Sequence, residues 1–186
     1  MSQKLKNTIQ TFLSVYDLFP EFRYIGDPIL RTPTEDATLE EGREIGKKLG
    51  EVLVAYRKKV GYGRGLAAPQ IGIGKRVLTT FVDDAVYTYI NPRITERSSE
   101  TNFYRELCLS SGIMWGDIKR SESITMTWTD IEGNEHEEKF EGFMARLLQH
   151  EEAHLDGEVS LDIAIPGTIE IISSDPLEEK LRSERL

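Results

Sequence analysis

Two of the three histidines in this chain lie four residues apart, within the stretch LLQHEEAHLDG. Positions i and i+4 of an α-helix share a face, so His150 and His154 project together, with Glu151 close beside them. The pair continues the apolar row of Phe143 and Leu147, which predicts that both imidazole rings point into the protein core. The fold must therefore enclose a helix whose buried face carries polar, chemically active groups.

The pattern of apolar residues elsewhere predicts an α+β fold. A long helix is expected over 39–60, where apolar residues form one stripe, Thr38 with Glu41 makes a capping box, and Gly61 ends the helix. A second long helix is expected over 142–155. Runs of β-branched and aromatic residues predict strands over 76–82, 86–90, 123–129 and 136–142. This order favours antiparallel β-sheets packed around the central helix that carries the H-E-x-x-H sequence.

The length of 186 residues fits a single domain that spans the whole chain. An N-terminal helical extension is expected over 1–22, because the apolar spacing over 8–19 is helical. The tail over 170–186 is expected to hold a short helix that starts near Asp175.

Charge and hydropathy restrict the partners and the compartment. The net charge of −9 argues against a large nucleic-acid footprint, so no DNA partner is expected. No apolar run reaches the roughly 18 residues of a membrane span, and the N-terminus lacks the continuous apolar stretch of a signal peptide. Cys108 is the single cysteine, so no internal disulfide forms, which suits a reducing compartment such as the cytoplasm.

The H-E-x-x-H spacing is typical of a metal site. Two imidazoles on one helical face reach a single zinc-type ion about 2 Å away, and the glutamate between them handles the proton of a bound water. The alternative is an acidic helix whose two histidines find ordinary hydrogen-bond partners. A working site also needs a third protein ligand and an open coordination position.

Several residues are candidates for the third ligand. Ser160 occupies the last position of the longer metzincin motif, and serine is a poor ligand, so that motif is excluded. Glu178 and Glu179 lie in a terminal segment expected to be exposed, and His136 lies in a charged strand. Cys108 offers a thiolate, which is a strong ligand for iron, zinc or nickel; its alternative role is core packing.

The segment GRGLAAPQIG predicts a tight backbone loop in which Pro69 prevents a helix from starting. Gly63, Gly65 and Ala68 also fit a dinucleotide-binding pattern, with Asp83 near the offset of a ribose-binding acid. That pattern requires a preceding strand, whereas this segment follows a helix, and Pro69 removes an N–H group that the nucleotide would need. The dinucleotide interpretation is therefore set aside.

Three segments taken together resemble the peptide deformylase family, whose motifs run G-x-G-x-A-A-P-Q, E-G-C-x-S and Q-H-E-x-x-H in this order. The corresponding segments here are GRGLAAPQ (63–70), ELCLS (106–110) and QHEEAH (149–154). GDPILRTP, YINPRI and the hairpin before the histidine helix also look like their family counterparts. The resemblance covers about residues 24–165.

This resemblance implies a metal-dependent hydrolase that removes the N-formyl group from formyl-methionyl peptides or nascent chains and releases formate. It implies one ion per chain, ferrous iron, with zinc or nickel as substitutes. The implied metal ligands are Cys108, His150 and His154. The implied catalytic residues are Glu151 as general base and then acid, with the Gln70 amide and the Leu109 backbone N–H as oxyanion donors. The ribosome is a further candidate partner, although the net charge argues against a purely electrostatic contact.

The resemblance assigns a structural role to Glu106, paired with Arg120, and a role in approaching the substrate to Gly65. The facing of the second long helix predicts a hydrophobic substrate pocket. Its candidate residues are Phe143, Met144 and Leu147, together with part of the GRGLAAPQ loop; for any one of the three, ordinary core packing is the favoured alternative.

Two positions depart from the family pattern. Leu107 replaces the glycine before the cysteine, next to the expected substrate path, where its side chain can crowd the cleft or shift the substrate preference. Ala153 replaces a usual aspartate, and the loss of such supporting hydrogen bonds weakens sites by roughly 10–100-fold. The expected protein is an active, divergent deformylase; the alternative is a catalytically silent or specificity-shifted relative that binds metal and peptides.

Overall fold

The computed structural model of the chain describes residues 3–172 and has the predicted α+β architecture, with two antiparallel sheets around a helix. Its long helices are α1 (Gln3–Leu18), α2 (Leu39–Val60) and α3 (Gly142–Leu155). One sheet has the order β1-β2-β3-β6-β7, with strands Gly65–Ala67, Val77–Val82, Ala85–Arg97, Ser123–Thr129 and Glu135–Glu141. The other sheet has the order β4-β5-β8, with strands Thr101–Leu107, Met114–Ser121 and Glu170–Ile171.

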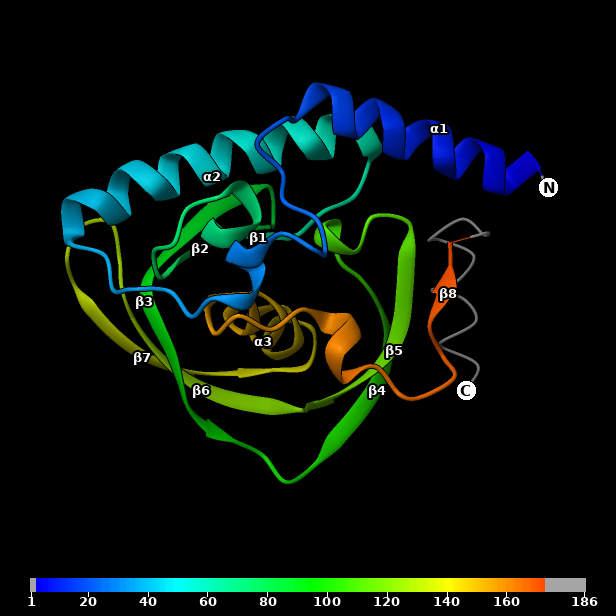
Figure 1. Cartoon of the computed structure of the whole chain (residues 1–186). Helices are drawn as coiled ribbons and strands as arrows, with labels where there is room; N and C mark the ends of the chain where they lie inside the picture. The colour runs from blue at the N-terminus through cyan, green and yellow to red at the C-terminus, as the bar shows by residue number, and fades with distance from the viewer. Residues whose placement is uncertain (1–2, 173–186) are drawn as a thin grey trace.

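Helix α3 lies at the centre of the molecule (Figure 1), with β2 and β3 on one side, β4 and β5 on the other, and α2 and α1 across the top. Its buried residues include the polar side chains Gln149, Glu151, Glu152 and His154. Polar groups are rarely buried without partners, so α3 depends on specific contacts with both sheets. The sequence prediction of an enclosed helix with polar groups on its buried side is confirmed.

Helix α2 begins and ends as predicted. The Thr38 hydroxyl accepts a hydrogen bond from the Glu41 N–H, the Glu41 carboxylate accepts one from the Thr38 N–H, and Gly61 follows in a left-handed conformation. A feature that the apolar stripe did not reveal is a second stripe of Gly42, Gly46 and Gly50, which lies against β3. A Cβ atom at Gly46 would come within 2.7 Å of the Thr88 hydroxyl oxygen, so the helix backbone rests directly on the strand.

Helix α1 packs beside the loop that follows β4. The Phe12 ring lies over Gly112, where a Cβ atom would be 3.2 Å from the ring, and it meets the Tyr24 ring edge-on. The backbone N–H of Ile25 donates to the carbonyl of Ser110 at 2.9 Å. The N-terminal helix thus supports the segment that directly follows Cys108.

Some boundaries differ from the sequence predictions. The strand expected over 86–90 continues to Arg97, because its pairing with β6 resumes after a register shift at Asn91 and Pro92, where a proline without an N–H is tolerated. The N-terminal helix, Gln3–Leu18, lies within the expected extension over 1–22 and begins before the apolar spacing over 8–19. The helix predicted near Asp175 lies outside the described residues.

The segment predicted as a loop over 63–72 contains strand β1 and a 3₁₀ helix, Ala68–Ile71. The expectation that Pro69 prevents a helix was wrong, because proline is compatible with a first helical turn, whose N–H groups have no partner within the helix. Further 3₁₀ helices occupy Pro28–Arg31, Leu109–Ser111 and Ser160–Ile163. Across residues 3–172, no helix combines the length and the apolar character that crossing a membrane requires.

The glycine stripe on α2 generates a stability prediction. Gly46→Ala and Gly50→Ala both gain about 1 kcal/mol of helix propensity. The new methyl group at 46 collides with Thr88, whereas at 50 it meets one methyl group of the partly exposed Val86 at 3.0 Å. We expect Gly46→Ala to be less stable than Gly50→Ala by about 1–3 kcal/mol in chemical denaturation. Equal stabilities would contradict the close packing of α2 on β3.

Candidate metal centre

A thiol and two imidazoles meet in the interior of the protein. Cys108 directly follows the last residue of β4, and His150 and His154 lie one turn apart on α3. The ligand atoms of these three residues all lie within 4.8 Å of one another, and the Cys108 sulfur is 3.2 Å from Nε2 of His154. Cys108 and His154 are each 1% exposed, so the cluster is shielded from bulk water.

Glu106 orients the first histidine. Its carboxylate is hydrogen-bonded to Nδ1 of His150 at 2.7 Å, and it accepts hydrogen bonds from Arg120 at 2.7 and 2.9 Å and from Arg146 at 2.5 Å. Because Nδ1 is occupied, Nε2 is the ring nitrogen of His150 left for a metal. Burial raises the pKa of Glu106, but His150 and Arg120 outweigh that effect and hold it well below its usual range.

The pairing of Glu106 with Arg120 is thus present, and Arg146 is a partner that sequence reasoning missed. Arg146 precedes His150 by four residues on α3, so the same helical spacing that identified the histidines also places this arginine on their face. It reaches Glu106 across 40 sequence positions.

Glu151 lies beside the ligands and is 4% exposed. Burial raises the pKa of its carboxyl group, with His150 and His154 acting in the opposite direction. One carboxylate oxygen, Oε2, has no hydrogen-bond partner among the described residues. A Cβ atom at Gly65 would lie 2.6 Å from the Glu151 carboxyl carbon, so the space above this glycine is filled by the glutamate side chain.

Gln70 is held with its donor group facing the cluster. Its side-chain oxygen accepts a hydrogen bond from the Ala67 N–H at 2.9 Å, so its NH₂ group points toward the Cys108 sulfur at 3.6 Å and the Ser110 hydroxyl at 3.3 Å. Leu109 opens the 3₁₀ helix after Cys108. The first N–H groups of a helix have no partner within it, which makes the Leu109 N–H suitable as a donor to a ligand.

The predicted pocket residues do not share one environment. Phe143 is 56% exposed, and its ring centroid lies 5.9 Å from the Arg64 guanidinium carbon. Met144 packs against the core cluster that contains Leu148, while Leu147 is buried. Leu107 is half-buried at the end of β4.

The other candidate ligands lie elsewhere. His136 is on β7, where it bonds to Asp130 at 2.7 Å and stacks on Trp128. Ser160 lies outside the cluster, and Glu178 and Glu179 lie outside the described residues. Within residues 3–172, the Cys–His–His group is the one set of three such side chains close enough to share an ion.

The donor set fits a divalent transition metal. Burial raises the pKa of the Cys108 thiol, but His154 and His150 outweigh burial and place it well below the usual value, which favours the thiolate that metals bind. One thiolate and two imidazoles match the three-ligand pattern of catalytic sites, in which a fourth position stays open. The unpartnered oxygen of Glu151 beside this set gives a proton acceptor where such a site needs one.

Comparisons with known proteins agree with this geometry. The family model described as polypeptide deformylase matches residues 20–168. The peptide deformylase of Dictyoglomus thermophilum is 37% identical over 149 residues, which cover 80% of this chain and 95% of that protein. The peptide deformylase of Thermotoga maritima is 35% identical over 147 residues, which cover 78% of this chain and 87% of that protein.

Solved structures give the same result. The crystal structure of the Thermotoga maritima peptide deformylase superimposes with a TM-score of 0.70, covering 78% of this chain and 97% of that one, at 35% identity. The Acinetobacter baumannii enzyme bound to Met-Ala-Ser has a TM-score of 0.69 at 28% identity, covering 76% of this chain and 96% of that one. The matched region contains the thiol, both histidines and their supporting residues, and this chain belongs to the peptide deformylase family.

Proposed function

We propose that this chain is an active, divergent peptide deformylase, which hydrolyses the N-formyl group of formyl-methionyl peptides or nascent chains to formate and a free N-terminal amine. The observation that carries the proposal is the completeness of the buried site. A three-ligand Cys–His–His set, an unpartnered glutamate oxygen and an oriented amide donor lie together, in a chain that belongs to the peptide deformylase family.

In this proposal Cys108, His150 and His154 hold the ion, which when bound supplies Lewis-acid activation of a water molecule and of the formyl carbonyl. Glu151 accepts the proton of the attacking water at its carboxylate and later delivers it to the departing amine nitrogen. Water oxygen joins the formyl carbon, the carbon–nitrogen bond breaks, and the proton that Glu151 carried completes the new amine.

Two donors serve the carbonyl oxygen as negative charge develops on it. The Gln70 NH₂ group is held in place by the Ala67 N–H on its other end, so it needs no reorganisation during the reaction. The Leu109 N–H is the second donor. Donors arranged in advance in this way typically contribute about 3–4 kcal/mol each to stabilisation of the transition state.

We propose one ferrous ion per chain as the native cofactor, with zinc or nickel as substitutes, since this ligand set suits all three. The Acinetobacter baumannii relative was solved with Met-Ala-Ser bound, which supports a peptide ligand for this chain. We keep Gly65, Leu107, Phe143, Met144 and Leu147 as proposed substrate contacts.

A ribosome-borne nascent chain is a proposed source of the substrate. The cytoplasm is the proposed location, because a metal-binding thiolate must stay reduced. We further propose a single domain with an N-terminal extension over 1–22 and a tail over 170–186.

The competing function is a catalytically silent or specificity-shifted relative that binds metal and peptides. Leu107 and Ala153 are the observations in its favour, because each replaces the usual family residue directly beside a ligand. Neither removes a ligand, the general base or an oxyanion donor, so we rank this function second.

The first test is formate release from a formyl-Met peptide by the iron-loaded protein under anaerobic conditions. We expect turnover by the wild type and a loss of about 100-fold or more in Glu151→Gln, which keeps the side-chain shape but cannot take up the proton. Leu107→Gly is assayed in parallel. If neither the wild type nor Leu107→Gly releases formate, the silent relative is the correct interpretation.

A second test concerns the ligands. The purified protein should carry about one equivalent of metal, and Cys108→Ser should lose it, because three protein ligands are needed for tight binding. His136→Ala is the matched control, since this histidine lies outside the cluster, and its metal content should equal that of the wild type. Full retention of metal in Cys108→Ser would remove the thiol from the site.

A third test concerns the contact between Gly65 and Glu151. Gly65→Ala should displace the carboxylate, and because small misplacements of a catalytic group can cost about 100-fold in rate, we expect formate release to fall by that order while metal content is unchanged. Gly74→Ala is the control, since a Cβ atom there meets nothing within 4 Å. An unchanged rate in Gly65→Ala would argue against Glu151 as the base.

A further inference from the structure

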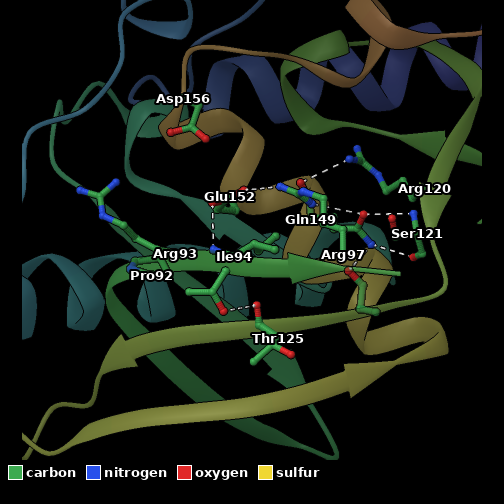
Figure 2. Close-up of polar contacts among 12 residues, drawn as sticks. Pro92, Arg93, Ile94, Arg97, Arg120, Ser121, Thr125, Gln149, Glu152 and Asp156 are labelled. Atoms are coloured by element: carbon green, nitrogen blue, oxygen red, sulfur yellow. Dashed lines mark hydrogen bonds and ion pairs between the residues drawn. The ribbon is translucent and has the colours of Figure 1, made fainter. Parts of the chain in front are cut away.

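The second acidic residue of the HEEAH sequence has no role in the chemistry above. Glu152 is 5% exposed and lies against β3 (Figure 2). One carboxylate oxygen accepts hydrogen bonds from the Ile94 N–H and from Arg76, each at 3.2 Å, and the other accepts one from Arg97 at 3.2 Å. A buried carboxylate with three donors from outside its own helix, two of them on β3, is an anchor point for that helix.

The position of this anchor on β3 is fixed by the strand itself. The pairing of β3 with β6 shifts register on both sides of this region, between Ile90 and Arg93 and again between Ile94 and Glu96. A bulge leaves a backbone group outside the regular ladder. Ile94 lies between these two shifts, and β2 pairs with β3 only as far as Ile90, so the Ile94 N–H is open to Glu152, which docks α3 on the strand.

Gln149, one turn earlier, connects the same helix to the other sheet. Its side-chain amide accepts a hydrogen bond from the Ser121 N–H at 3.2 Å and donates to the Ser121 carbonyl at 2.9 Å (Figure 2). Arg97 joins the two anchors, since it donates to Glu152 and, at 3.4 Å, to the Gln149 side chain.

The chain of contacts continues to the metal ligands. Arg120 donates to the Gln149 carbonyl at 3.3 Å and also holds Glu106, which is bonded to His150. A continuous polar path therefore runs from the β3 bulge to the imidazole of His150.

We propose that Glu152 is a positioning residue for the metal centre. By fixing α3 on the β3 bulge, it sets the placement of His150 and His154 toward Cys108. The inference rests on the proposed function for the identity of the ligand face, so its test measures metal binding and the imidazole environment and does not depend on catalysis.

The test compares Glu152→Gln with Asp130→Ala. Asp130 lies in the β6–β7 turn, where it accepts hydrogen bonds from three backbone N–H groups and bonds to His136, so its loss weakens the fold away from α3. Zinc affinity is measured by competition with a chelator, and folding by thermal denaturation. We expect Glu152→Gln to bind zinc roughly 10–100-fold more weakly, and Asp130→Ala to lose stability with unchanged affinity.

The three histidines provide a second measurement that a purely stabilising role would not affect. In ¹⁵N-detected spectra of the imidazoles, Glu152→Gln should move the signals of His150 and His154 and leave that of His136 in place. Asp130→Ala should give the opposite pattern. A folded Glu152→Gln protein with wild-type zinc affinity and unmoved His150 and His154 signals would overturn the proposal.

Two possible outcomes require an additional variant or measurement. If Glu152→Gln fails to fold, Arg97→Ala takes its place, because the Arg97 side chain is 48% exposed; a several-fold loss of zinc affinity supports the proposal, and unchanged affinity contradicts it. If the wild type binds no zinc, the proposed function fails, and the imidazole spectra of the metal-free proteins still decide the role of Glu152.

Discussion

The carboxylate of Glu106 is the contact on which the rest of the site depends. It lies two residues before Cys108, on β4, and binds Arg120 from β5 together with Arg146 and His150 from α3. An isolated buried anion costs several kcal/mol, so the strand, its neighbour and the helix are stable in this arrangement only when all partners are in place. The same contacts that hold the two parts of the fold together thereby fix which nitrogen of His150 faces the thiol.

The parts of the structure that the sequence predicted are those with local signals. Helix α2 is indicated by its capping box and apolar spacing, and helix α3 by its apolar spacing and the glycine that follows it. His150 and His154 are indicated by their spacing of one helical turn. Strands β4 and β5 escaped prediction because charged and small polar residues interrupt their apolar pattern. They are held by cross-strand pairs such as Arg105 with Asp117, which only the register reveals.

The candidate site was predictable to the same degree. Cys108 was the strongest of several possible third ligands, and the family motifs selected it. Arg146 was hidden because its partner lies 40 positions away, and the anchor at Glu152 was hidden because it depends on a bulge in β3. The reactive groups of the site could thus be predicted from the sequence, whereas the residues that support them depend on contacts between distant parts of the chain.

Helix α1 precedes the region that matches the family model, yet its Phe12 ring lies on Gly112, at the end of the loop that carries Leu109, the proposed oxyanion donor. In a loop exposed to solvent on that side, adjustment around a bound ligand would require only local rearrangement. Here the same adjustment disturbs the packing of a helix. This enzyme and relatives with identical reactive groups are therefore expected to differ in inhibitor selectivity. The difference would lie in how easily the loop that contains Leu109 and Gly112 moves when a ligand binds.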